Sequence, residues 1–345
     1  MSIRFRVIIL ALIGLVAVSV TAYWFHVAGQ MRKGIESFAA QRRAEGWTVQ
    51  MDEPVLGGFP RAVTARLDSL SLRSPAGLSW KADGVTITLP LADPLHVTVE
   101  APGFHRLSGF DWSGIISAQT ATARLRLTTE GKLSAVTVDA ATLVLEQPGV
   151  DPLSAASLAL TAERLTPPES GHDKPSLAAT LSLRGLDLPE LTNLPLARRL
   201  ETVQVEARLL GAPPDAAPLA ALAAWSADGG TVELDRITVE WAPLTLEANG
   251  TLALDSALQP LIATTARIRG WGELVTRLVQ VRLIDPGMAE AAKIMMAILA
   301  RPDSQGRPTL TVPLTLQDGV LTAGQVRIAQ VPPLPVPAPT PGAPP

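Results

Sequence analysis

The first hydrophobic pattern in the chain is a run of 19 residues without a charge, residues 7–25. A helix of this length spans roughly 28 Å, close to the thickness of the hydrocarbon core of a bilayer. Arg4 and Arg6 precede the run, and its last three residues are aromatic, which is typical of a membrane interface. The pattern therefore predicts a single transmembrane helix. A cleaved signal peptide is the alternative, because Val20 and Ala22 supply small residues before a cut; we favour the uncleaved anchor, since the apolar run continues past that point.

Residues 28–45 continue the helical pattern beyond the anchor. An apolar stripe that includes Met31 and Ile35 runs along this segment, and charged or polar residues fill the other positions. Gly46 is a natural terminator of the helix. We therefore predict an anchor and helical stalk over residues 1–46, with the stalk lifting the body off the membrane.

From residue 47 to residue 331, apolar and polar residues alternate in short segments, a pattern typical of strands with one wet face and one apolar face. The clearest segments are 125–128, 135–138, 143–145, 158–160, 181–183 and 203–206. Dipeptides typical of tight turns between strands are Asp83-Gly84, Glu130-Gly131, Asn249-Gly250 and Asp318-Gly319. The fold class we predict is mainly β (α+β), with a curved antiparallel sheet and a few short helices.

Helical patterns in the body are few. They cover residues 215–227, 273–283 and 288–299, and more weakly residues 191–200. The third of these helices carries a Met-rich apolar stripe that we assign to the core rather than to an exposed, adaptable surface. The residues of this stripe are Met295, Met296, Ile298 and Leu299.

Two parts of the body resemble each other. Residues 67–72 match residues 234–239, and residues 78–84 match residues 244–250. In both copies the apolar positions shift phase by one residue, which would turn the later side chains to the other face unless a bulge or a strand junction intervenes. We interpret the match as two similar β-rich halves; chance similarity between strands of biased composition is the alternative.

These patterns divide the chain into four parts. After the anchor and stalk come a first β-rich half, residues 47–199, and a second β-rich half with a helix pair, residues 200–331. Residues 332–345 contain eight prolines, so we expect a disordered, extended tail. Such a tail is either a solvated spacer, which we favour, or a ligand for a partner's groove.

Composition narrows the functional classes. With 47% hydrophobic and 18% charged residues, the 345-residue chain is too apolar to be disordered and too charged to cross a membrane many times. The formal net charge of −3 predicts no nucleic-acid partner. Cysteine is absent, which excludes disulfides and thiolate chemistry and fits an oxidising compartment.

Catalytic motifs are not found. The chain has no nucleophile elbow, phosphate-binding loop or zinc-protease motif. His96 and His105 lie near acidic residues, but no helical period brings them together, and we expect ordinary surface histidines there and at His172. Gly57-Gly58-Phe59-Pro60 is the most distinctive motif, interpreted either as a corner joining the stalk to the sheet or as a plain turn. We assign no catalytic, cofactor-binding or metal-binding residues and no cofactor.

A family resemblance rests on motifs spread along the chain. They are the anchor, Trp47, Gly57-Gly58-Phe59-Pro60, Trp80 before Asp83-Gly84, Pro90 to Pro94 leading to His96, Gly229 to Leu234, Asn249 to Leu252 with Leu254-Asp255, and Leu314 to Gly319. Their order resembles that in an uncharacterised family of alphaproteobacterial envelope proteins, domain of unknown function 2125. The Asn-Gly motif and the ending are more distantly similar to AsmA-type envelope proteins, in which a bent sheet forms a lipid groove. The resemblance implies an envelope location and brings no established activity or catalytic residues.

Location and function follow as expectations. Basic residues on the two flanks of the anchor do not set its orientation, but residues 46–345 carry seven more acidic than basic side chains, and long domains translocate largely regardless of charge. We expect a single-pass protein of the bacterial inner membrane, held by residues 7–25, with a cytoplasmic N-terminus and a periplasmic body. We expect no enzyme, and a sheet groove that binds lipid or another apolar molecule. The alternative is a scaffold or interaction module for other envelope proteins.

Overall fold

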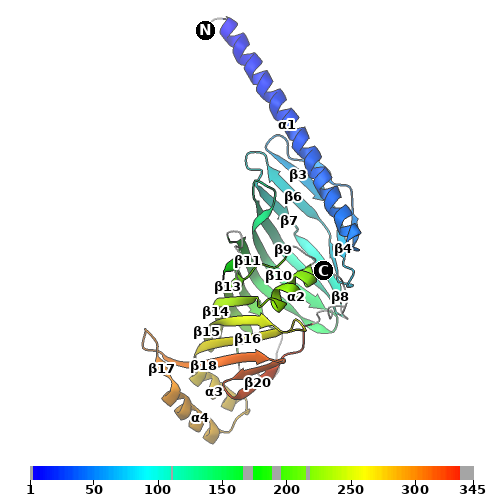
Figure 1. The fold of residues 1–345 in the computed structure, drawn as a ribbon. Helices are drawn as coiled ribbons and strands as arrows, with labels where there is room; N and C mark the ends of the chain where they lie inside the picture. Colours follow the sequence, from blue (N-terminus) through cyan, green and yellow to red (C-terminus); the bar gives the residue numbers. More distant parts are fainter. Residues whose placement is uncertain (1–2, 110–111, 166–173, 189–195, 215–217, 335–345) are drawn as a thin grey trace. The chain divides into compact units, whose positions relative to one another are not determined.

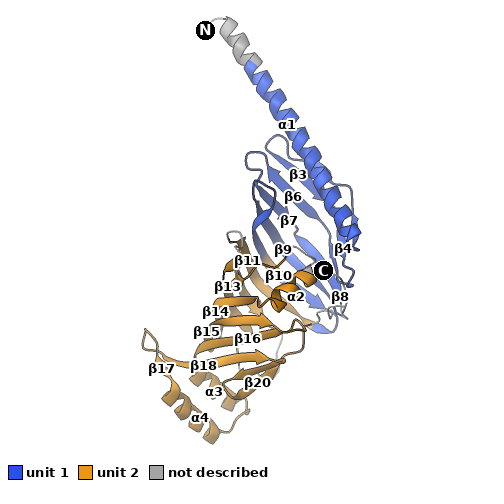
Figure 2. Ribbon diagram, in the orientation of Figure 1, with its two compact units in different colours: residues 1–140, 144–150 blue, residues 141–143, 151–345 orange. Residues whose placement is uncertain are grey.

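The computed structural model describes residues 3–109, 112–165, 174–188, 196–214 and 218–334 (Figure 1). The chain forms two compact units, residues 1–140 with 144–150 and residues 141–143 with 151–345 (Figure 2). This division lies near residue 150, whereas the sequence repeat placed the boundary between the halves at residue 199. Strands on both sides of residue 199 pair with one another in one sheet, which holds them in the same unit.

Helix α1 (Ile3–Ala44) is a single helix of 42 residues, and it is long and apolar enough to cross a membrane. It ends where predicted, because Gly46 adopts a positive φ of 85° and its N–H bonds to the carbonyl of Arg43. The next N–H, that of Trp47, bonds to the carbonyl of Arg42, so the last turn is closed by backbone groups alone.

The C-terminal half of α1 packs against the sheet of unit 1. Trp24, Ala28 and Ala39 are buried, and the first two form a cluster with Val63. Val63 is fully buried in the strand that follows the first glycine pair. The segment expected to be a stalk is thus a packed element of unit 1, because its small residues allow close contact with a strand.

Unit 1 is an antiparallel sheet that divides into two arms. β7 and β8 pair with successive segments of the long strand β9, and the arms β8–β5–β4–β1 and β7–β6–β3–β2 extend from there. The strands are β1 (Thr48–Met51), β2 (Val55–Gly57), β3 (Ala62–Leu67), β4 (Leu70–Arg73), β5 (Ser79–Ala82), β6 (Val85–Pro90), β7 (His96–Glu100), β8 (Gly103–Gly109), β9 (Trp112–Leu127) and β10 (Leu133–Gln147), the last shared with unit 2. A small core that includes Leu67, Ala82 and Val85 joins side chains of both arms.

Unit 2 is an antiparallel meander. Its strands pair in the order β11–β12–β13–β14–β15–β16–β18–β19–β20, and among the described residues β11 and β20 do not pair with each other, so the sheet stays open. The strands are β11 (Val150–Arg164), β12 (Pro175–Asp187), β13 (Arg199–Leu210), β14 (Thr231–Trp241), β15 (Leu244–Leu254), β16 (Pro260–Arg269), β17 (Arg301–Pro302), β18 (Pro308–Gln317), β19 (Val320–Ala323) and β20 (Val326–Gln330). The short β17 pairs only with β18. The predicted mainly β, antiparallel fold is confirmed.

In the part of unit 2 that the structure describes there are three helices, and each was predicted. They are α2 (Pro218–Ala227), α3 (Trp271–Gln280) and α4 (Pro286–Leu299). α2 is held to the sheet by Trp225, whose indole N–H donates to the carbonyl of Leu210 at 2.8 Å. The weaker helix prediction over residues 191–200 is wrong at its end, where residues 199–200 begin β13; residues 189–195 lie outside the described part, as does the tail from residue 335.

The shift in apolar phase takes two forms, as predicted. In unit 1 it falls at the junction between β3 and β4, which pair with different strands, β6 and β5. In unit 2 it is a bulge in β14: between the pairs Leu234–Gly250 and Ile237–Ala248, β14 has two residues where β15 has one. The bulge keeps the apolar residues of β14 on one face of the sheet.

The hairpin turn predicted at Asn249-Gly250 is wrong, because this pair lies inside β15. A Cβ at Gly250 would collide with the backbone of Ala263 and Thr264 on β16, so close approach of two strands, not a turn, requires this glycine. The other three dipeptides lie between strands, as expected; they are Asp83-Gly84, Glu130-Gly131 and Asp318-Gly319.

Replacing Gly250 by alanine tests this close approach. We expect Gly250→Ala to destabilise the β15–β16 pair by about 1–3 kcal/mol, since a backbone has to move to admit the methyl group. Hydrogen exchange of peptides from β15 and β16 should accelerate roughly 5- to 150-fold. The matched control is Gly84→Ala at the equivalent position of the first copy, where no atom lies within 4 Å of the place that the added methyl group would occupy. Equal exchange in both variants would contradict the explanation.

Candidate functional site

The sheet of unit 2 carries a continuous apolar face. This face consists of two cross-strand rows of residues. In each row, every residue pairs with the next one across seven strands, from β11 to β18. The first row is Leu158, Leu183, Val203, Val239, Leu246, Ile268 and Leu310, and the second is Leu160, Leu181, Val205, Ile237, Ala248, Ala266 and Val312. The side chains are all aliphatic, so the face offers no hydrogen bonds and no titratable group.

The apolar face is not closed over. All of its fourteen residues except Ala248, Ala266 and Leu310 remain partly exposed. In a sandwich, a second sheet would bury such a face completely. The face can therefore take a flat or extended apolar ligand, and the Leu, Val and Ile side chains suit an acyl chain.

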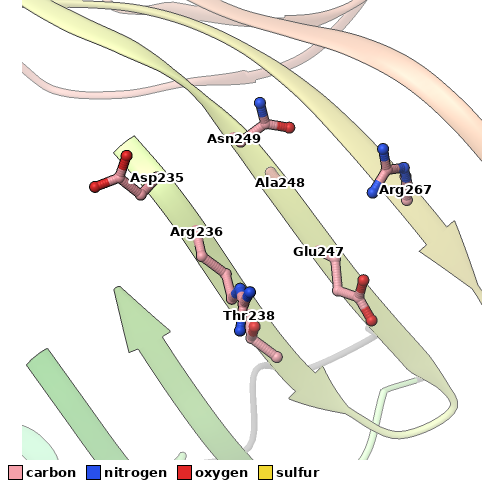
Figure 3. Close-up of a pocket in the computed structure, with 7 residues that line it drawn as sticks. All are labelled: Asp235, Arg236, Thr238, Glu247, Ala248, Asn249 and Arg267. Atoms are coloured by element: carbon pink, nitrogen blue, oxygen red, sulfur yellow. The ribbon is translucent and has the colours of Figure 1, made fainter. Parts of the chain in front are cut away.

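The opposite face holds a polar hollow of 410 Å³ beside the bulge. Figure 3 shows its lining residues on three adjacent strands, β14, β15 and β16. They are Asp235, Arg236, Thr238, Glu247, Ala248, Asn249 and Arg267. The bulge creates the hollow, because it places two consecutive residues of β14, Asp235 and Arg236, at the surface.

Ion pairs occupy the two carboxylates of the polar hollow. Arg208 donates to both oxygens of Asp235, at 2.6 and 2.8 Å, and these hydrogen bonds lower the pKa of the Asp235 carboxyl. Arg269 donates to Glu247 at 2.6 Å. Arg236 and Arg267 form no hydrogen bond or ion pair with the described residues. Both carboxylates are thus paired, and Asp235, Arg236 and Arg267 are exposed.

Unit 1 has its own hollow of 650 Å³, and its lining includes residues of β4, β5 and β8. Lys81 and Arg106 lie directly opposite each other on β5 and β8, and Arg73 is their diagonal neighbour on β4. Arg106 donates to Asp83 at 2.6 Å, and beside it the Ser79 and Ser108 hydroxyls bond to each other at 2.6 Å. Opposed cations on neighbouring strands favour a bound anion or a counter-ion at this surface.

The histidines take structural roles. His96 lies 2.7 Å from the carboxylate of Asp93. The ring of His105 stacks on Trp80, and its Nε2 lies 2.9 Å from the carbonyl oxygen of Ala101. No group of three or more His, Asp and Glu side chains in the described ranges is placed to hold a metal ion, and His172 lies outside those ranges.

The Met-rich stripe of α4 is exposed, so its assignment to the core is wrong. Among the residues of α4, only Ala289 is buried, and the helix touches little beyond α3 and the start of β18. Exposed apolar residues of α4 are Met288, Ile294, Met295, Ile298 and Leu299. The spacing of the stripe correctly predicted a helix, but the side chain that α4 buries is the small Ala289, while Met295 and Ile298 stay exposed.

The charged residues beside the bulge were missed by sequence reasoning. The phase shift at Leu234 was the available signal, because a bulge exposes the residues that it inserts. Nothing in the local pattern shows that Arg208, 27 residues earlier, meets Asp235 across a strand.

Asp303 connects the β17–β18 hairpin with the ion pair of Arg269 and Glu247 beside the polar hollow. Its carboxylate accepts the N–H groups of Arg307 and Gln305, each at 2.9 Å, and bonds to the Arg307 side chain at 2.8 Å. These contacts, the backbone N–H of Arg307 first, lower the pKa of Asp303 to about 2. Arg269 lies 3.4 Å from the same carboxylate, so it connects Asp303 with Glu247.

Comparison with known proteins identifies one family. Residues 24–332 match the family described as an uncharacterized protein conserved in bacteria, DUF2125. No curated protein and no solved structure gives a significant match. The matched range begins at Trp24, the first buried residue of α1, and includes the strands and helices of both units.

The pH dependence of the β17–β18 hairpin tests the role of Asp303. Because its pKa is lower in the folded chain than the ordinary value of 3.8, Asp303 contributes stability above about pH 4 and loses that contribution as the pH falls toward 2. We expect Asp303→Asn to lower the thermal midpoint at pH 6, and the difference from the native chain to shrink as the pH falls through this window. A difference that stays constant from pH 6 to pH 2 would contradict the assignment. Asp318→Asn, in another turn of unit 2, is the control.

Proposed function

We propose that this chain, which belongs to the DUF2125 family of bacterial proteins, is a membrane-anchored envelope protein that holds a lipid acyl chain on the apolar face of unit 2. The single observation that carries the proposal is the aliphatic face of seven paired strands that stays partly exposed. An aqueous monomer with such a face would leave a large apolar area in water, which is unfavourable unless a ligand or partner covers it.

The anchor in this proposal is the first part of α1. Side chains such as Leu15 and Val18 are more than 60% exposed, so no protein packing accounts for their apolar character. A lipid environment accounts for it, and the aromatic residues at the end of the run suit the interface. We place the N-terminus in the cytoplasm and the two units in the periplasm, attached to the inner membrane, since the body carries an excess of acidic residues.

The proposed role is non-enzymatic. The apolar face supplies neither a nucleophile nor an acid–base pair, and the carboxylates of the polar hollow are engaged by Arg208 and Arg269. Binding on the apolar face would use burial alone, at about 25 cal/mol for each Å² of apolar surface removed from water. Such a site selects for chain length and shape rather than for a particular headgroup.

A second candidate function, protein interaction, rests on the exposed α4 surface. Four large, exposed apolar side chains lie within six residues of this helix, and Ile298 is 70% exposed. Methionine and isoleucine on an exposed helix suit an adaptable apolar contact with another protein. In this case the chain would serve as a scaffold for other envelope proteins.

Photocrosslinking of lipid to the full chain tests the first candidate. In nanodiscs that contain phosphatidylethanolamine with a diazirine on its acyl chain, we expect adducts on strands β12 to β16 as well as on α1. Val205→Glu, which places a charge on the apolar face, should lower the strand adducts severalfold and leave the α1 adducts unchanged, because a carboxylate is costly to bury beside an acyl chain. Gln204→Glu, on the other face of the same strand, is the matched control. Adducts on α1 alone would rule out the lipid site.

Crosslinking from α4 tests the second candidate. A benzoylphenylalanine at Ile298 should capture a discrete protein partner in the membrane fraction, and Ile294→Glu should lower the yield severalfold because it breaks the apolar surface. The control position is Glu290, which is exposed on the same helix. Equal labelling from both positions would exclude α4 as a specific contact.

A further inference from the structure

The turn between β2 and β3, residues 58–61, lies against α1 at the end of the apolar run. The indole N–H of Trp24 donates to the carbonyl oxygen of Ala62 at 2.7 Å. The Trp24 ring also meets the Phe59 ring edge-on, with 5.8 Å between the centroids. The sheet of unit 1 therefore begins at the level of Trp24. His26, the first titratable residue after the apolar run, lies two residues further along the chain.

The turn that carries Phe59 is closed tightly around Gly58. Gly58 has a positive φ of 90°, and its carbonyl accepts the N–H of Ala62 at 3.1 Å. A Cβ at Gly58 would lie 2.8 Å from the carbonyl oxygen of Ala62, so this tight turn requires glycine. A backbone closed in this way leaves the Phe59 ring 55% exposed although it touches Trp24.

Phe59 is one of several exposed aromatic side chains at this level. Phe25 is 65% exposed and Tyr23 is 46% exposed. Arg61, also exposed, has no hydrogen bond or ion pair from its guanidinium to any part of the chain that the structure describes. Exposed aromatic rings beside an unpaired arginine are typical of protein surfaces at a membrane interface. There the rings lie at the level of the lipid headgroups, and guanidinium groups bind phosphates.

We propose that the β2–β3 turn is a membrane-docking element: Phe59 inserts into the interface of the bilayer that α1 spans, and Arg61 lies at the phosphate level. The occupant is the bilayer, because the turn is continuous with the apolar surface of α1. This inference rests on the proposed anchor, since without a membrane around residues 7–25 the turn has no bilayer to meet. Trp24 would then hold the sheet at the membrane surface by its hydrogen bond to Ala62.

The absence of cysteine allows a direct test, because any single cysteine introduced is the only labelling site. Full chains with Phe59→Cys, Arg61→Cys, Leu15→Cys or Leu78→Cys are labelled with an environment-sensitive fluorophore. They are placed in vesicles of phosphatidylethanolamine and phosphatidylglycerol that contain lipids with a shallow or a deep spin-label quencher. Leu15 reports on the anchor. Leu78, 46% exposed, lies in the β4–β5 turn, which meets Gly46 at the far end of α1, about 30 Å from Trp24 along the helix.

We expect the shallow quencher to quench the fluorophore at position 59 strongly. We also expect this fluorophore to emit at a shorter wavelength than the one at position 78. Position 61, where the native guanidinium forms no hydrogen bond or ion pair with the described residues, should also be quenched severalfold more than position 78, so a folding defect of Phe59→Cys does not decide the outcome. Deep quenching at position 15 together with water-like signals at positions 59 and 61 would overturn the docking proposal and leave the anchor intact. Loss of quenching at position 15 would overturn the anchor itself.

Discussion

The register of β14 is the constraint on which the apolar face of unit 2 depends. Side chains of a strand alternate between the two faces, so a slip of one residue moves every later side chain to the opposite side. The apolar positions of this strand change phase after Leu234, and an unbroken strand would turn Ile237 and Val239 toward the polar face. The bulge absorbs the extra residue, so Val232 and Leu234 stay on the same face of the sheet as Ile237 and Val239.

In unit 1 the same phase change falls at a junction between two strands instead of at a bulge. There the chain leaves β3 after Leu67 and starts β4 at Leu70, and the partner strands separate at Asp83-Gly84 in the same way. The result is a sheet with two arms and a small shared core, rather than one broad face. Two segments of similar sequence therefore support a local core in one unit and an extended apolar surface in the other.

Much of the fold could be predicted from local pattern. The apolar run, the alternating strands, the helix pair at Pro286 and the phase shift are each visible in one continuous stretch of the sequence, and each was placed correctly. Contacts between distant segments were not visible. The pairing of β13 with β12 and β14, which brings Arg208 to Asp235, depends on long-range packing, and so does the position of Trp24 on β3.

The errors have particular physical causes. Asn249-Gly250 has the composition of a turn, but its glycine is needed where two strands approach closely, and composition does not separate these cases. The stripe of α4 has helical spacing, but spacing does not say which side of a helix is buried, and Ala289 rather than Met295 is buried. The candidate site itself was named only as a sheet groove without residues, because its membership depends on cross-strand register.

The uninterrupted course of α1 has a mechanical consequence. No proline lies between Ile3 and Ala44, and the helix joins the sheet through Trp24, Ala28 and Ala39 instead of through a loose linker. If residues 7–25 span a bilayer as proposed, rotation of that portion about the helix axis turns unit 1 by the same angle, because a continuous helix resists twisting. A binding contact on one side of that portion of the helix would therefore fix the direction in which unit 1 faces, measured in the plane of the membrane.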